Sequence, residues 1–300
     1  MSHQTNKSLR PGKHFWALSL AVCLALSLTL APPAAPAAQS DRVFEPLRDL
    51  LLQQGLAQAE VERLLAAPQL KFEDALMARM LSVPESRLNY GQFLGRQALQ
   101  SARRFMDKHA ATLKQTQRRT GVPPAVVVAI LTVESRLGSY TGKHRVLNML
   151  ASQAVLDTPA AQERLARRWP AKRRHQLQEE GTQQRLTRRA RWARQELAAL
   201  LRLAQKQKVS PWQYRGSLAG ALGMAQFMPS SALAYGVDGD ADGVLNLDRP
   251  ADAIHSVANY LKLHGWRPGI SHRAQMRVIL AYNRSDPYAR TVLELARRLS

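Results

Sequence analysis

The sequence has one cysteine, Cys23, among its 300 residues. Because Cys23 lies in an apolar N-terminal segment, we expect the mature protein to use neither a disulfide nor thiol chemistry. We also find no convincing strand alternation, internal repeat, heptad or low-complexity tract. Apolar residues instead recur at helical spacing along most of the chain, so the sequence predicts an all-α fold.

Acidic residues are scarce, with 22 Asp and Glu against 43 Lys and Arg, for a formal net charge of +21. This excess is compatible with nucleic acid, anionic lipid or an acidic cell-wall polymer as a partner, and an arginine-rich proteome would produce it with no partner. Eleven basic residues lie between Arg164 and Arg194, against only Glu179 and Glu180. A solvated helical hairpin would explain this segment, and no nucleic-acid module is recognisable, so we expect no nucleic-acid partner.

The first 38 residues have the pattern of a secretory signal peptide. Basic residues precede an apolar run over residues 15–30, and residues 35–37 offer a small-x-small cleavage site. An uncleaved anchor is the alternative, but the apolar run is short for a membrane-spanning helix. We therefore expect export to the periplasm.

Cys23 could in principle mark a bacterial lipoprotein, since residues 20–23 read LAVC. Val22 is bulky for the position before the cysteine, and a further apolar run follows. We therefore do not expect Cys23 to be lipidated.

Beyond residue 38, the sequence predicts two regions. Residues 39–93 form a helical lead-in, with short amphipathic helices over 44–56, 57–67 and 72–81. Residues 94–300 form the main domain, starting with one long helix over 95–120. Within it we expect helices over 146–156, 195–205, 250–264, 274–283 and 286–299, and a basic insertion over 155–187.

Residues 121–138 read GVPPAVVVAILTVESRLG and predict a buried helix that begins near Pro124. The helix is apolar almost all round, so it belongs inside a domain. Glu134 stands at its end, where apolar neighbours and the negative end of the helix dipole should raise the pKa of the carboxyl. Such a group can act as a general acid. Alternatively, Glu134 only marks the point where the helix reaches the surface.

The segment DGDADGVLN resembles the start of a calcium loop. Asp238, Asp240 and Asp242 occupy positions 1, 3 and 5, and the Val244 carbonyl would be the ligand at position 7. Arg249 replaces the glutamate of an EF-hand at position 12, so Asp252 on the following helix is the best substitute. A polar turn without a metal ion is the alternative.

An aromatic and amide set could bind sugars, because aromatic faces pack on sugar rings and amides bond to hydroxyls. Each member alone would more often be structural. The set comprises Gln226, Tyr260, Tyr282, Asn283 and Tyr288.

Three blocks, residues 121–151, 217–266 and 281–289, closely resemble the lytic murein transglycosylase B family of glycoside hydrolases. The resemblance begins near residue 40 and is carried most specifically by GALGMAQFMPSS and the Asp-rich loop. It implies a lysozyme-like helical core. It also implies cleavage of the β-1,4 bond between N-acetylmuramic acid and N-acetylglucosamine in peptidoglycan without water, which leaves 1,6-anhydro ends.

By this resemblance, Glu134 is the only catalytic acid and base, and the C6 hydroxyl of the substrate is the nucleophile, so no second carboxylate is needed. The resemblance also implies a cleft, a calcium site and an arginine pair that binds glycan or peptide carboxylates. The cleft residues are Ser217, Gln226, Tyr260, Tyr282, Asn283, Tyr288 and Tyr90. The calcium ligands are Asp238, Asp240, Asp242, the Val244 carbonyl and Asp252. The arginine pair is Arg188 and Arg189, an assignment that depends on where the insertion is placed.

The predicted function is therefore a periplasmic lytic transglycosylase that acts on peptidoglycan strands, with structural Ca²⁺ and no organic cofactor. We expect a monomer, with cell-wall synthesis or divisome proteins as possible partners. The alternatives are a lysozyme-type muramidase that uses water and a peptidoglycan-binding protein that does not cut.

Overall fold

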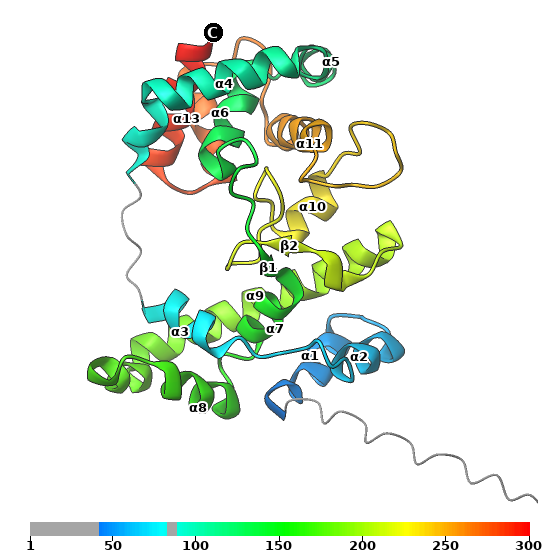
Figure 1. The fold of residues 1–300 in the computed structure, drawn as a ribbon, viewed down its shortest axis with the longest axis vertical. Helices are drawn as coiled ribbons and strands as arrows, with labels where there is room; N and C mark the ends of the chain where they lie inside the picture. The colour runs from blue at the N-terminus through cyan, green and yellow to red at the C-terminus, as the bar shows by residue number, and fades with distance from the viewer. Residues whose placement is uncertain (1–41, 83–88) are drawn as a thin grey trace, which may run out of the picture. The chain divides into compact units, whose positions relative to one another are not determined.

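The computed structural model describes residues 42–82 and 89–300, which belong to one compact unit, Ala38–Ser300 (Figure 1). The predicted signal peptide and Cys23 lie outside the described residues. No helix in the described ranges is long and apolar enough to span a membrane.

The N-terminal region forms the short amphipathic helices that the sequence predicts. They bury residues spaced three or four apart, such as Val61, Leu64 and Leu65 in α2, because this spacing places them on one helical face. The elements are η1 (Arg42–Phe44), α1 (Leu47–Gln53), α2 (Gln58–Leu65) and α3 (Asp74–Ser82).

Side chains of α7 (Val146–Ala154) bind the chain just before α3. Ser152 Oγ accepts a hydrogen bond from the Glu73 amide at 3.0 Å, and Asn148 Nδ2 donates to the Glu73 carboxylate at 3.3 Å. These bonds link the N-terminal region to the remainder of the same unit. The predicted division at residues 93 and 94 stays a prediction.

The expected long helix over 95–120 is two helices, α4 (Arg96–Lys108) and α5 (Ala110–Thr120), after the short η2 (Tyr90–Leu94). His109 breaks the helix with φ −112° and ψ 23°, outside the helical range. No proline or glycine marks this position, so the sequence pattern did not show the break. Gly121 ends α5 in the left-handed conformation, with φ 73°.

Helix α6 (Pro124–Ser135) is the buried helix that the sequence predicts. Its first residue is Pro124, and all nine residues from Ala125 to Val133 are buried. It packs against α4, α5, α11 and α13, so tertiary packing surrounds it, as Figure 1 shows for α4 and α13. A helix without a polar face is stable only in such a position.

The middle of the chain is dominated by α9 (Glu180–Gln207), a 28-residue helix that packs along the fully buried α7. In the sequence, α7 and α9 are separated by α8 (Pro159–Arg168) and η3 (Ala171–Gln178), which fall within the predicted basic insertion.

Two strands of two residues each, β1 (His144–Arg145) and β2 (Arg215–Gly216), pair antiparallel and are too short to show alternation in sequence. The remaining elements are η4 (Pro211–Gln213), α10 (Pro229–Tyr235), α11 (Pro250–Leu263), α12 (His272–Tyr282) and α13 (Asp286–Leu299). The all-α prediction is thereby confirmed.

Candidate functional site

Glu134 lies in the last turn of α6, where two left-handed residues end the helix. Arg136 and Leu137 have φ values of 48° and 60°, a conformation that non-glycine residues rarely adopt and that tends to occur at functional sites. The hydroxyl of Ser135 stabilises this turn. It donates to the Met224 carbonyl at 2.8 Å and accepts from the Gly138 amide at 3.0 Å. The end of α6 is thus joined to the 217–228 loop.

The residue Glu134 is half-buried, and its Oε1 accepts a hydrogen bond from the Tyr288 hydroxyl at 2.6 Å. Burial raises the pKa of Glu134 from 4.5 to about 7, although the bond from Tyr288 acts in the opposite direction. The penalty for a desolvated charge therefore exceeds the stabilisation by one hydrogen bond. Neither cause involves another carboxylate. The raised pKa agrees with the prediction from the apolar helix.

Three tyrosines of the predicted cleft set pack together beside this carboxyl, and one of them, Tyr288, bonds to it. Tyr288 is 1% exposed, and burial together with Glu134 raises its pKa well above 10, so it stays a hydrogen-bond donor. The Tyr282 ring stacks nearly parallel to it at 6.5 Å, and the Tyr90 ring meets it edge-on at 6.4 Å. The structure thus brings Tyr90 to the ring of Tyr288, whose hydroxyl bonds to Glu134.

Tyr260 and Tyr282 use their hydroxyls to bond to the backbone. Tyr282 donates to the Ala225 carbonyl at 2.5 Å, and Tyr260 donates to the Ala281 carbonyl at 2.7 Å. Sequence reasoning missed His264, which stacks on Tyr260 at 3.9 Å. Its position four residues after Tyr260, on the same helical face, is the signal that could have found it.

Ser217 and Gln226 line a groove of about 510 Å³ with the 139–144 segment that follows α6. Gln226 has φ 49°, and its Nε2 donates to the carbonyls of Thr141 and Gly223 at 3.2 and 2.8 Å. The 217–228 loop therefore connects the groove to the surroundings of Glu134. Gln226 lines the groove, and the carbonyls of Met224 and Ala225 accept bonds from Ser135 and Tyr282. Asn283, half-buried, directly follows Tyr282 at the end of α12.

The groove also contains a residue that sequence reasoning missed, Tyr140, which is 66% exposed. The Arg136 guanidinium lies 5.2 Å from the centre of its ring. An exposed aromatic ring held by a cation offers a flat apolar face to a ligand.

The predicted arginine pair lies on α9, with Arg188 exposed and Arg189 half-buried. Arg189 Nε donates to Gln153 Oε1 at 2.8 Å. Gln153 is fully buried, and its Nε2 donates in turn to the Leu218 carbonyl at 3.3 Å, beside Ser217. Arg189 is thereby linked to the groove. Gln153 was missed, although a glutamine inside an apolar helix is itself a signal.

The Asp-rich loop brings together three of the four predicted aspartates. Carboxylate oxygens of Asp238, Asp240 and Asp252 all lie within 4.8 Å of one another. Asp252 is fully buried and accepts hydrogen bonds from the amides of Gly239 and Asn246 at 2.8 and 2.6 Å. Clustered hard oxygen ligands of this kind fit Ca²⁺.

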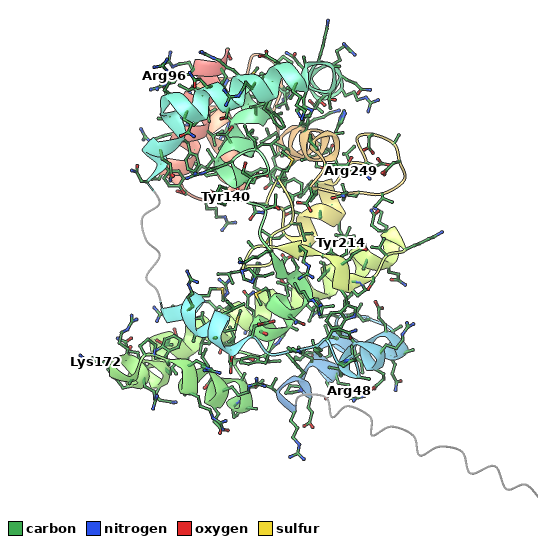
Figure 2. All side chains as sticks on the ribbon, viewed as in Figure 1. Arg48, Arg96, Tyr140, Lys172, Tyr214 and Arg249 are labelled. Carbon is green, nitrogen blue, oxygen red and sulfur yellow. The ribbon has the colours of Figure 1, made fainter. Side chains whose placement is uncertain are left out.

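Asp242 lies outside this three-carboxylate cluster. It forms an exposed ion pair with Arg249, which also contacts Asp240 at 3.3 Å. Figure 2 labels Arg249. Asp242 Oδ1 accepts from the Val244 amide at 2.9 Å, so the loop folds back on itself at these positions. The assignment of Asp242 and the Val244 carbonyl as ligands stays a prediction.

The chain is similar to several known proteins. Membrane-bound lytic murein transglycosylase B of Escherichia coli (strain K12) is 37% identical over 165 residues, which cover 55% of this chain and 38% of that protein. The match thus spans little more than a third of that relative.

Solved structures match over most of the chain. Soluble lytic transglycosylase SltB1 from Pseudomonas aeruginosa has a TM-score of 0.68 and 26% identity over 86% of this chain and 98% of its own. The Escherichia coli lytic transglycosylase Slt35 in complex with calcium has a TM-score of 0.64 and 25% identity, over 86% of this chain and 92% of its own. These likenesses confirm the predicted lysozyme-like, mainly helical fold.

The profile of the family described as Transglycosylase SLT domain matches residues 39–278, which include Glu134, the groove and the Asp-rich loop. Together with the similar proteins, this match confirms the resemblance that the sequence showed: the chain belongs to the transglycosylase SLT domain family.

Proposed function

We propose that the protein is a lytic transglycosylase that cleaves the β-1,4 bond between N-acetylmuramic acid and N-acetylglucosamine in peptidoglycan, leaving 1,6-anhydro ends. The observation that carries this proposal is the isolation of Glu134. Among the described residues, no neighbouring carboxylate contributes to its pKa of about 7, whereas most glycosidases use a flanking pair. One carboxyl suffices when the substrate supplies its own nucleophile.

The geometry supports different roles for the two carboxyl oxygens of Glu134. Oε1 accepts the hydrogen bond from Tyr288, so the acidic proton belongs on Oε2. From there it would protonate the glycosidic oxygen as the bond to C1 breaks. The resulting carboxylate would take the proton of the C6 hydroxyl as that oxygen attacks C1. Tyr288 stabilises the carboxylate between the two steps.

We assign the sugar contacts to the groove and the tyrosine cluster. Ser217, Gln226 and Asn283 offer polar groups to sugar hydroxyls, and Tyr90 and Tyr282 offer ring faces beside Tyr288. Tyr260 positions the end of α12 through its bond to Ala281. Arg188 and Arg189 suit carboxylates of the lactyl group or the peptide.

We further propose that Ca²⁺ binds the Asp-rich loop through Asp238, Asp240 and Asp252, with Asp242 and the Val244 carbonyl as further ligands. The similar Slt35 structure contains calcium, which supports this choice of metal. A bound ion would neutralise the clustered carboxylates and stabilise the loop, whose Leu247 carbonyl accepts a hydrogen bond from Met224 at 2.8 Å. Its role is therefore structural.

The proposed reaction takes place where peptidoglycan is, so we propose a periplasmic location, testable by cell fractionation. The monomeric state and the divisome partners stay predictions.

The decisive experiment is digestion of purified sacculi, followed by mass analysis of the soluble products. The wild type should release 1,6-anhydro muropeptides, and Glu134→Gln should release none while keeping its fold. Glu45→Gln, which removes an exposed carboxyl near α1, is the matched control.

The same experiment separates the alternatives. Products heavier by one water would identify a lysozyme-type muramidase. Sacculus binding by the wild type without any soluble product would identify a protein that only binds peptidoglycan.

A further inference from the structure

Helix α8 and η3 present several basic side chains outside the candidate site. Arg167, Arg168, Lys172 and Arg174 are exposed, and Arg164 is half-buried beside them. We call these five residues the α8–η3 basic face. Lys172 projects from the edge of the described structure in Figure 2.

The face contains a hollow that could receive an anionic group. Asp74, Arg164, Arg167 and Arg168 line a volume of about 440 Å³. The Arg164 guanidinium lies 5.1 Å from the centre of the buried Phe72 ring, which holds it in position. Three arginines and one aspartate thus line the same hollow.

The acidic neighbours do not neutralise this face. Asp74 lies 3.5 Å from Arg168 and 4.0 Å from Arg164, and Glu163 pairs with Arg167 at 2.5 Å. Within the described ranges, these two carboxylates pair with the three arginines of α8, and the ion pairs involve neither Lys172 nor Arg174 of η3. Because exposed ion pairs are weak and screened by salt, carboxylates of a ligand can compete with these internal partners.

We propose that the α8–η3 basic face binds carboxylates on the peptide stems of peptidoglycan, as a second contact outside the Glu134 site. The proposal rests on the proposed function, which makes peptidoglycan the substrate. Guanidinium groups match carboxylates with paired hydrogen bonds, and a polymer that repeats such carboxylates can occupy several cations at once.

The apolar residues of α8 and η3 argue against a lipid bilayer as the partner. Leu165, Trp169 and Leu177 are buried within the protein. The large exposed hydrophobic residues of the described ranges are Leu52, Tyr140, Val244 and Leu263, and none lies on α8 or η3. Helices that bind membrane surfaces usually insert an apolar face, which this region does not offer.

The position along the chain also fits a substrate contact. Helix α9 begins at Glu180, directly after η3, and carries Arg188 and Arg189. The basic face and the arginine pair therefore lie on consecutive elements that pack together. A strand held at the arginine pair has further stems available for the α8–η3 face.

The test measures binding of the full chain to purified sacculi, with Glu134→Gln in every protein so that the substrate is not degraded. One variant adds Arg167→Gln, Arg168→Gln, Lys172→Gln and Arg174→Gln. The control adds four exposed changes on other helices, Arg104→Gln, Lys114→Gln, Arg118→Gln and Arg273→Gln, which remove the same charge. We expect about tenfold weaker binding for the first variant and little change for the control.

A second arm uses sacculi whose stems have been removed by an amidase, and a third uses vesicles with anionic phospholipid. On stem-free glycan, the two variants should bind equally. An equal loss for both variants on intact sacculi, or a loss that persists on stem-free glycan, would overturn the proposal. So would a selective loss of vesicle binding with sacculus binding unchanged.

This outcome is independent of the proposed reaction. With Glu134 restored, the α8–η3 variant should cleave soluble, stem-free glycan at the wild-type rate and give anhydro ends. If anhydro ends appear but the four α8–η3 substitutions do not weaken sacculus binding, only the proposed peptide contact is wrong. If no anhydro ends appear with the wild type, the proposed function fails.

Discussion

Glu134 and Asp252 are both carboxyl groups whose pKa is raised by burial, yet their surroundings are opposite. Glu134 lies in the last turn of α6, where the helix dipole disfavours a negative charge, and it has one hydrogen bond from Tyr288. Asp252 lies in the first turn of α11, where the dipole favours the charge, and it accepts two backbone amides.

The neighbours complete the contrast. Asp238 and Asp240 lie beside Asp252, whereas no carboxylate in the described part of the chain contributes to the pKa of Glu134. One environment favours a proton on a single carboxyl, and the other gathers negative charge that a divalent cation can neutralise. Burial alone therefore does not determine the role of an acidic residue.

The largest expected effect is on catalysis. Glu134→Gln should lower the rate of anhydro product release by at least about 10³-fold, since it removes both the acid and the base. Asp252→Asn should leave the chemistry at Glu134 in place, so its rate of anhydro product release should fall far less. Comparable losses in the two variants would contradict the separation of roles.

Calcium should distinguish the two sites next. Chelation should lower the Tm of the wild type, because a ligand at about a hundred times its Kd stabilises the fold by about 3 kcal/mol. Asp240→Ala should remove this sensitivity, and Asp248→Ala, an exposed residue of the same loop, should keep it. Equal melting of the wild type with and without chelator would count against the metal.

The raised pKa of Glu134 should appear in the pH dependence of stability. Its pKa rises from 4.5 to about 7 on folding, so the folded state is disfavoured as the pH increases through this window. Above pH 7, Glu134→Gln should be more stable than the wild type by about 2 kcal/mol, allowing for the part of the carboxyl that water reaches.

Below pH 4.5 this difference should vanish, because the carboxyl is protonated in both states. Urea denaturation at pH 4 and pH 8 measures it, and Glu45→Gln should show no such change. If the difference in unfolding free energy between Glu134→Gln and the wild type is the same at both pH values, the pKa of Glu134 is not raised.

The smallest effect concerns Tyr288. Its hydroxyl lowers the pKa of Glu134, so Tyr288→Phe should raise that pKa further. The basic limb of the pH profile of kcat/KM should then move upward by the same amount. Tyr90→Phe keeps the Tyr288 hydroxyl and is the matched control. An unchanged limb would show that the profile reports another group.

The sequence predicted the two carboxyl sites unequally well. An apolar run that ends in Glu134 indicates burial directly, because nine consecutive buried residues leave a clear pattern. Tyr288 could not be identified as its partner by pattern, since 154 residues separate them and only packing of α13 on α6 joins them. The residue types suggested Tyr288 as one member of a sugar-binding set, and the family resemblance placed it at the cleft, but neither identified it as the partner of Glu134.

In the Asp-rich loop, spacing located the aspartates but not their partners. Asp242 and Arg249 form an ion pair that depends on how the loop closes. Likewise, the break at His109 has no proline or glycine to mark it, and the strands β1 and β2 have two residues each, so both are too short to leave a periodic signal.

The hydrogen bond between Tyr288 and Glu134 also gives the site an internal spectroscopic probe. A phenolic proton that is shielded from solvent, in a hydrogen bond whose two oxygen atoms lie 2.6 Å apart, exchanges slowly enough to be sought by NMR. Its chemical shift would follow the charge on Glu134. Titrating that one resonance would measure the protonation state of the carboxyl without substrate or turnover.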